Sequence, residues 1–117
     1  MAGHVIKKYF SNNNIYTVTS VEEHNIINEK LTINYDLIFD NYDYIINCLR
    51  CLVEDSDVNP SKAIIYNSYL PNILNDYYKN KNTKIIHLST DCVFLGNKGG
   101  YKETYKPDGI NNYSKTK

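Results

Sequence analysis

The chain has 117 residues, enough for one domain or part of one, and its 13 lysines and arginines balance 13 aspartates and glutamates. A hydrophobic share of 42% provides a core and excludes a disordered chain. Neutral charge without a basic stripe gives no reason to expect nucleic-acid binding, and no apolar run of about 18 residues predicts a membrane span. A polar start without a secretory signal, and three cysteines that favour free thiols, indicate a cytoplasmic protein.

The first third of the chain predicts a helix and then a strand. Residues 5–10 place their apolar side chains on one helical face. Residues 15–19 alternate apolar and polar side chains and include β-branched ones, as a strand does. Residues 21–33 fit neither pattern clearly, and residues 35–39 predict a short helix.

The middle of the chain predicts two buried strands on either side of a long helix. Residues 44–49 and 84–88 are apolar runs with the length of a buried strand. Residues 53–59 are acidic and predict a loop. A helix over residues 60–79 begins with a proline, which suits a first turn, and Pro71 within it predicts a kink or a break.

The end of the chain predicts a long loop and a last helix. Glycines and a proline fill residues 96–109, and Asn111 or Asn112 could cap a helix that begins at Tyr113. Helices and strands thus alternate along the chain. That alternation predicts an α/β fold with a parallel sheet and helices on its faces.

Two groups of polar residues near the end could carry chemistry. The second strand is followed by Ser89 and Thr90, and ligands of open parallel sheets bind beyond the carboxyl ends of the strands. Tyr113 and Lys117 are four residues apart, which puts them on one helix face. A neighbouring ammonium favours ionisation of a tyrosine hydroxyl, and such a pair can pass a proton to or from a carbonyl or alcohol oxygen. The spacing alone is more often an exposed helix face.

The sequence around this pair is more specific. It reads Ser-Thr-Asp-Cys-Val-Phe-Leu-Gly at residues 89–96, then carries Glu103 and Pro107, then reads Tyr-Ser-Lys-Thr-Lys at residues 113–117. This resembles the dTDP-4-dehydrorhamnose reductase group of extended short-chain dehydrogenases. That family shows Ser-Thr-Asp-x-Val-Phe-x-Gly, a loop with Glu and Pro, and Tyr-Gly-x-[Ser/Thr]-Lys. Ser114 in place of the glycine is a mild departure.

The resemblance extends towards the start of the chain. Ile-Ile-Asn-Cys-Leu at residues 45–49 is similar to a family strand whose backbone runs beside the cofactor. Asn59, Pro60 and Asn67 match the family's Asn-Pro-x-x-Ala-x-x-x-Asn helix. Gly3 would be the third glycine of Gly-x-x-Gly-x-x-Gly, which allows close packing of helix and strand.

The resemblance implies a Rossmann-type, doubly wound parallel sheet. Residues 1–117 would be a partial NAD(P)-binding domain that ends in the Tyr-x-x-x-Lys helix. The family's first strand and its C-terminal substrate domain would lie outside the chain, so we expect an incomplete fold that is inactive and folds poorly alone. The full-length parent could form a homodimer.

The resemblance also implies an activity, the reduction of a 4-keto nucleotide sugar by NADPH or NADH in polysaccharide or deoxysugar biosynthesis. Tyr113 would protonate the developing alkoxide, Thr90 with Ser89 would hold the keto oxygen, and Lys117 would bind the nicotinamide ribose. The expected cofactor contacts are Gly3, Asn47, Cys48, Leu49, Ser89, Tyr113 and Lys117. The sequence does not choose between NADP and NAD.

Other interpretations remain open. The same fold could serve an epimerase or dehydratase that recycles its cofactor, a non-catalytic, cofactor-binding regulatory subunit, or an inactive remnant. Intact Thr90, Tyr113 and Lys117 argue against the regulatory subunit. Cys48 and Cys51 form a Cys-x-x-Cys pair without the further ligands that zinc needs, so no metal is expected. His87, on an apolar strand, is interpreted as a core residue.

Overall fold

The computed structural model describes residues 2–12, 24–27, 30–33 and 42–117. These residues form two units, Met1–Asp43 and Tyr44–Lys117. The strand predicted over residues 15–19 and the helix predicted over residues 35–39 lie outside the described residues.

The first unit contains a helix and a β-hairpin. Helix α1 (Ala2–Tyr9) confirms the helix predicted over residues 5–10 and begins earlier. Strands β1 (His24–Ile27) and β2 (Lys30–Ile33) pair antiparallel, with Ile27 opposite Lys30. This hairpin lies within residues 21–33, for which the sequence predicted neither a helix nor a strand. Strands of only four residues are too short to show a clear alternation of apolar and polar side chains.

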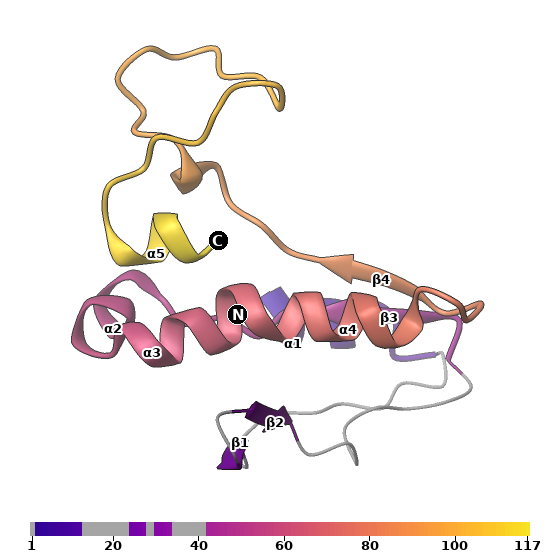
Figure 1. Cartoon of the computed structure of the whole chain (residues 1–117). Coiled ribbons are helices and arrows are strands. Elements are labelled where there is room, and N and C mark those ends of the chain that lie inside the picture. Colours follow the sequence, from indigo (N-terminus) through magenta and orange to yellow (C-terminus); the bar gives the residue numbers. More distant parts are fainter. Residues whose placement is uncertain (1, 13–23, 28–29, 34–41) are drawn as a thin grey trace. The chain divides into compact units, whose positions relative to one another are not determined.

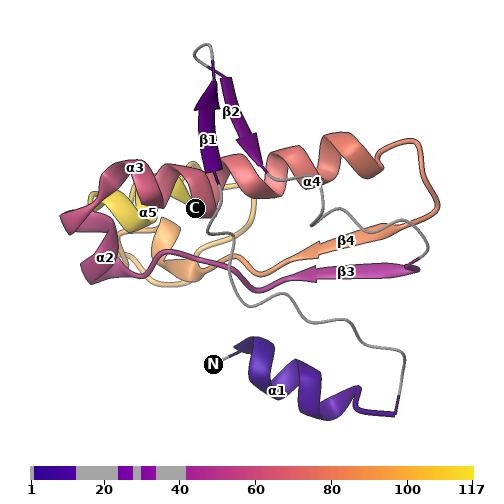
Figure 2. The same ribbon diagram turned by 90° about the horizontal axis from the view of Figure 1, so that it is seen from below.

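The second unit is built on the two predicted strands, which pair in parallel; the prediction that they are buried was wrong, since Asn47 alone is buried in them. Strand β3 (Tyr44–Asn47) pairs with β4 (Lys84–His87), and Asn47 lies opposite His87 at their carboxyl ends. Figure 2 shows the two strands side by side, with the helical connection between them running alongside. Parallel strands need such a crossover, and here it is a long run of helix.

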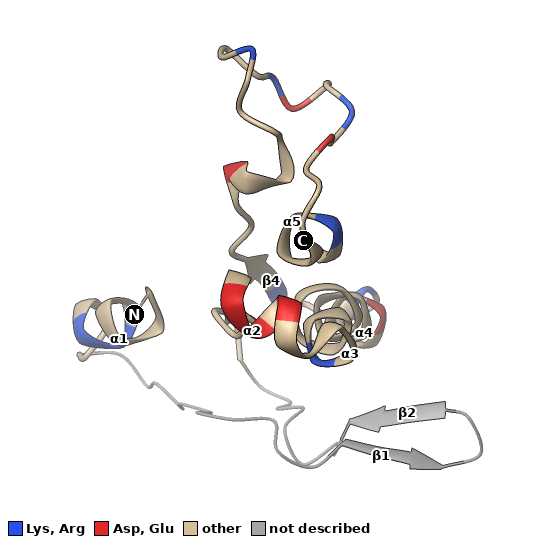
Figure 3. Cartoon of the chain, turned by 90° about the vertical axis from the view of Figure 1, so that its left-hand side faces the viewer, with Lys and Arg blue, Asp and Glu red and all other residues tan. Residues whose placement is uncertain are grey.

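The crossover begins with a helix where the sequence predicted a loop. Helix α2 (Val53–Val58) carries Glu54 and Asp55 in its first turn, where negative charge is favourable beside the positive end of the helix dipole. Ser56 is buried, and its hydroxyl donates to the Leu52 carbonyl over 2.6 Å. The acidic residues of α2, coloured red on the ribbon in Figure 3, are exposed and mark the solvent side of a helix, so the prediction of a loop was wrong.

The remaining crossover is one continuous helical run with a change of winding. It consists of α3 (Pro60–Ala63), the π-helical segment η2 (Ile64–Tyr69) and α4 (Leu70–Tyr78), seen end to end in Figure 1. Asn59 caps the start by accepting the Lys62 backbone N–H over 3.0 Å. The wide π turn lies directly before Pro71, which lacks an N–H to donate. Of the predicted kink or break at Pro71, the break is therefore wrong: the helical run continues through Pro71, with a π turn shortly before it.

Polar side chains make up four of the nine buried residues of this unit. Its buried residues are Cys51, Ala63, Leu70, Tyr78, Tyr113, Asn47, Ser56, Asn67 and Ser114. Buried polar groups cost free energy unless they are hydrogen-bonded, so the bonds that these side chains make define the architecture near the last helix.

Candidate active site

The segment after β4 turns sharply at Thr90. Thr90 has extended backbone angles, and its Oγ1 accepts the Cys92 backbone N–H over 3.2 Å, which caps the 3₁₀ turn η3 (Asp91–Val93). Thr90 is half-buried, and Ser89 is exposed. Both hydroxyls therefore lie just beyond the carboxyl end of β4, as the sequence predicted.

The long loop returns to this turn. The Val93 carbonyl accepts the backbone N–H groups of Asp108 and Gly109, over 3.2 and 2.9 Å. A Cβ atom on Gly109 would lie 2.4 Å from Cβ of Ser114 and 2.9 Å from the Cys92 carbonyl oxygen. Only glycine fits here without a shift of its neighbours, so this contact brings the last helix close against η3.

The last helix, α5 (Asn112–Thr116), carries the tyrosine–lysine pair. Asn111 caps it, because its Oδ1 accepts the Ser114 backbone N–H over 2.7 Å, which confirms the first of the two predicted caps. The Lys117 backbone N–H donates to the Tyr113 carbonyl over 3.2 Å. The two residues are thus one helical turn apart, and the Tyr113 side chain is only 5% exposed.

Lys117 is anchored to the strand that precedes Ser89. Its Nζ donates to the Leu88 carbonyl oxygen over 2.8 Å. Partial burial lowers the pKa of the Lys117 ammonium, and the charge of Arg50 lowers it further. The bond brings the pair on α5 to the carboxyl end of β4, where the two hydroxyls lie.

Asn67 is a structural residue for which the sequence predicted no role. Its side chain is 1% exposed and belongs to η2. Its Oδ1 accepts the Cys51 backbone N–H over 2.9 Å, and its Nδ2 donates to the Cys51 carbonyl and to Thr116 Oγ1, each over 3.1 Å. Ser68 Oγ also donates to the Thr116 carbonyl. This network joins α5 to the segment after β3. The match of Asn67 to the family's helix motif was the sequence signal that could have identified this role.

The end of β3 is held by a second buried amide. Asn47 is 5% exposed, its Oδ1 accepts the Leu49 backbone N–H over 3.1 Å, and its Nδ2 lies 3.2 Å from Nδ1 of His87. Cys48 and Leu49 are half-buried, and burial raises the pKa of the Cys48 thiol. The three residues expected beside a cofactor thus form one ordered turn.

Among the proposed residues of the second unit, Lys117 bonds to Leu88, directly before Ser89, and Asn47 lies opposite His87 at the carboxyl ends of the strands. Gly3 is the second residue of α1 and belongs to the first unit. Within the described ranges, no group of three or more His, Cys, Asp or Glu side chains could hold a metal ion. No helix in those ranges is both long and apolar enough to cross a membrane.

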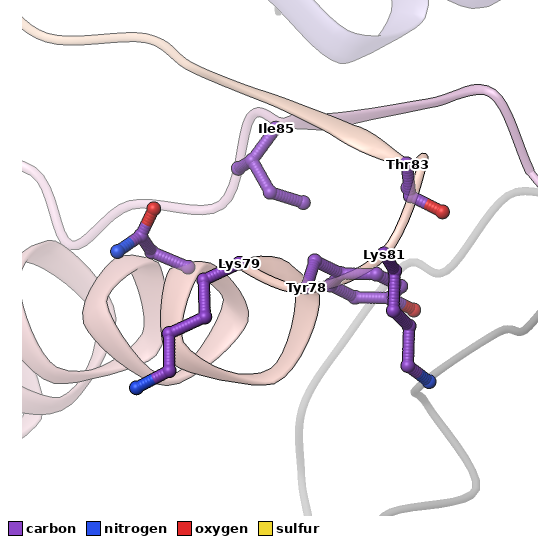
Figure 4. Close-up of a pocket in the computed structure, with 6 residues that line it drawn as sticks. Tyr78, Lys79, Lys81, Thr83 and Ile85 are labelled. Carbon is purple, nitrogen blue, oxygen red and sulfur yellow. The ribbon is translucent and has the colours of Figure 1, made fainter.

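One hollow lies at the opposite end of the strand pair. It is lined by Asn75, Tyr78, Lys79, Lys81, Thr83 and Ile85 (Figure 4). These residues flank the amino end of β4, whereas Thr90 and Lys117 belong to its carboxyl end. The hollow is therefore separate from the candidate active site.

Parallel strands, a helical crossover and a polar site at the strand ends define a Rossmann-like α/β protein. The family model described as "RmlD substrate binding domain" matches residues 1–117, and the chain belongs to this family. The fold is similar to that of a crystal structure described as a hypothetical dTDP-4-dehydrorhamnose reductase from Sulfolobus tokodaii. The TM-score is 0.73 at 24% identity, over 97% of this chain and 44% of that one. A comparison with curated proteins found no match.

Proposed function

We propose that the protein reduces a 4-keto nucleotide sugar with NADPH or NADH, and that residues 1–117 form part of its NAD(P)-binding domain. The observation that carries this proposal is the bond from Lys117 to the Leu88 carbonyl. This bond supports a position of the tyrosine–lysine helix near the strand end that Ser89 and Thr90 follow. Membership of the RmlD family and the name of the similar structure support the same reaction.

The donor set of the site fits a nicotinamide nucleotide. The Lys117 ammonium has three N–H donors, and one is used by Leu88, so two remain for ribose hydroxyls. The turn of Asn47, Cys48 and Leu49 borders the same strand ends. Gly3, near the start of α1, would allow close approach of a pyrophosphate. The cofactor would supply a hydride to the carbonyl carbon.

The chain's own residues would manage the oxygen and its proton. The Tyr113 hydroxyl would donate a proton to the alkoxide oxygen, and the hydroxyls of Thr90 and Ser89 would orient that oxygen. The Thr90 oxygen accepts from the Cys92 N–H over 3.2 Å, which fixes the position of the hydroxyl. Its proton is donated to Asp91 Oδ1 over 3.4 Å, a long bond that a substrate oxygen would replace. Lys117 would hold the ribose with its remaining N–H donors.

The proposal is tested with Tyr113→Phe in the full gene product that carries residues 1–117. Consumption of NADPH with a dTDP-linked 4-keto-6-deoxy sugar should fall by about 10²–10⁴-fold, while cofactor affinity stays nearly unchanged. Tyr44→Phe is the matched control, because Tyr44 is 57% exposed at the far end of β3, and it should keep its activity.

The products separate the alternatives. A sugar whose keto group is reduced, with stoichiometric loss of NADPH, supports the proposal. An isomerised or dehydrated sugar without net cofactor loss would indicate an epimerase or dehydratase. Cofactor binding without turnover of any nucleotide sugar would indicate a regulatory subunit. A Tyr113→Phe protein within a few-fold of the parent contradicts the assigned role of Tyr113.

A further inference from the structure

His87 and Asn47 face each other across the strand pair, and neither was given a role in proton transfer. They are partners in the parallel register of β3 and β4, so their side chains leave the same face of the sheet. The distance between Asn47 Nδ2 and His87 Nδ1 is 3.2 Å. This is a hydrogen bond whose polarity can be worked out from its surroundings.

The orientation of the Asn47 amide is fixed by a backbone group. The Leu49 N–H can only donate, and it points at Asn47 Oδ1 over 3.1 Å. The amide nitrogen must therefore face the ring, and an amide nitrogen can also only donate. Nδ1 of His87 accepts this bond with a lone pair, which requires a neutral ring with its proton on Nε2.

The surroundings of the ring also oppose a positive charge. Burial lowers the pKa of His87, and the charge of Lys117 lowers it further. From β3 the facing group is Asn47, which does not titrate. On α4, Asp76 pairs with Lys79, and Tyr78 lies beside Ile85 at the other end of the strand. Nε2 is buried and finds no hydrogen-bond partner among the described residues.

The Asn47–His87 pair is connected to Lys117 through Leu88, whose backbone N–H bonds to one side and whose carbonyl bonds to the other. The Leu88 N–H donates to the Asn47 carbonyl over 3.3 Å, and the Leu88 carbonyl accepts Lys117 Nζ. A proton on Nδ1 would set two N–H donors against each other and place a second cation beside Lys117. Both effects would loosen the strand end on which Lys117 is anchored.

We propose that Asn47 and neutral His87 form a positioning pair that holds the Leu88 carbonyl, and through it Lys117, in the arrangement the reaction needs. The inference deepens the proposed function and rests on it in so far as Lys117 serves catalysis. Protonation of His87 then releases Lys117. Activity should therefore fall reversibly at acid pH, because Lys117 loses its anchor.

Two variants change the polarity of the bond without removing it. Asn47→Asp keeps an oxygen for the Leu49 N–H and turns a second oxygen towards Nδ1, which favours a protonated ring. Its acid limb in the pH profile of kcat should move to higher pH. His87→Gln offers an oxygen to Asn47 Nδ2 and cannot become a cation. It should keep most of the neutral-pH activity and lose this acid limb.

A third variant removes the acceptor. His87→Leu leaves Asn47 Nδ2 without a partner, so activity should fall by roughly tenfold at every pH, about the effect of one lost hydrogen bond. Recovery by Gln but not by Leu separates a positioning role from a requirement for volume. A His87→Gln protein that keeps the parental acid limb would overturn the inference.

NMR titration of the cofactor-free protein tests the pair without any enzyme assay. The His87 signal is identified as the one that His87→Gln removes. We expect a proton on Nε2, a pKa below the ordinary histidine value, and a rise of that pKa in Asn47→Asp. A parent that does not reduce nucleotide sugars but shows these NMR results would refute the proposed function alone. A proton on Nδ1, or a pKa that Asn47→Asp leaves unmoved, would refute the pair.

Discussion

The two ends of the β3–β4 pair are formed by different kinds of side chains. At the amino end, Tyr44 is largely exposed beneath Lys84, Lys81 lies 3.7 Å from the centre of the Tyr77 ring, and Tyr78 is buried. At the carboxyl end, the buried amides of Asn47 and Asn67 bind backbone and side-chain groups, and Asn67 joins segments that are far apart in sequence. Aromatic and lysine side chains contact each other at the amino end, whereas the carboxyl end buries polar groups, each of which needs a hydrogen-bond partner. Such a free-energy cost is typical of the end of a sheet that positions catalytic or binding groups.

The largest effect on stability is expected when the amide of Asn67 is removed. Asn67→Leu leaves the buried N–H of Cys51 without a partner and removes the bond to Thr116. The Cys51 carbonyl keeps only the long bond from Ser56 Oγ, at 3.5 Å. The free energy of unfolding should fall by about 2–4 kcal/mol, for one unsatisfied buried group and two further lost hydrogen bonds. Asn72→Ala, an exposed site on the same helical run, is the control and should cost under about 0.5 kcal/mol. Equal losses would show that the carboxyl end is not special.

A smaller effect should follow from a methyl group between the loop and α5. Gly109→Ala places its Cβ 2.4 Å from Cβ of Ser114, so the helix must move, at about 1–3 kcal/mol. Ser114→Gly in the same protein removes the nearer contact and should recover part of the loss. Chemical denaturation of the two single variants and the double variant measures this coupling. Strictly additive costs would mean that these atoms do not meet.

The smallest effect concerns pH. Because burial and Lys117 lower the pKa of His87, the unfolded chain binds a proton there more readily than the native one. The stability contribution is complete above about pH 6.5, the ordinary histidine value, and is lost as pH falls through the lower native pKa. The difference in unfolding free energy between the parent and His87→Gln, followed from neutral to acid pH, isolates this contribution. A difference that grows in favour of the parent at low pH would contradict it.

Local sequence signals were enough for much of this architecture. Apolar runs located β3 and β4, and asparagine at position 111 marked the start of α5. The tyrosine–lysine spacing and the polar residues after β4 pointed to the same end of the sheet, and Lys117 joins them there. These features depend on neighbours in sequence or on the general geometry of parallel strands, so they can be inferred without coordinates.

Other features depend on contacts between distant segments. The π winding of η2 accompanies bonds from Asn67 to Cys51 and Thr116, which no local pattern contains. The acidic composition of α2 is typical of a loop, and only the burial of Ser56 in the structure shows which face of the helix is packed. The polarity of the Asn47–His87 bond required the Leu49 N–H as a third partner. Sequence reasoning therefore identified residues more successfully than the bonds between them.

The wide turn in the crossover helix limits how the chain can change in length. A π turn is equivalent to one residue inserted into an α-helix, and each residue of an α-helix turns it by about 100°. Because the wide turn absorbs that extra residue, deleting one residue within Ile64–Tyr69 would restore regular winding and change the direction of the side chains within the segment itself. Asn67 would then leave its partners. Insertions and deletions should thus be tolerated in the exposed residues 97–100 but not in η2, which fixes the spacing between Pro60 and Pro71.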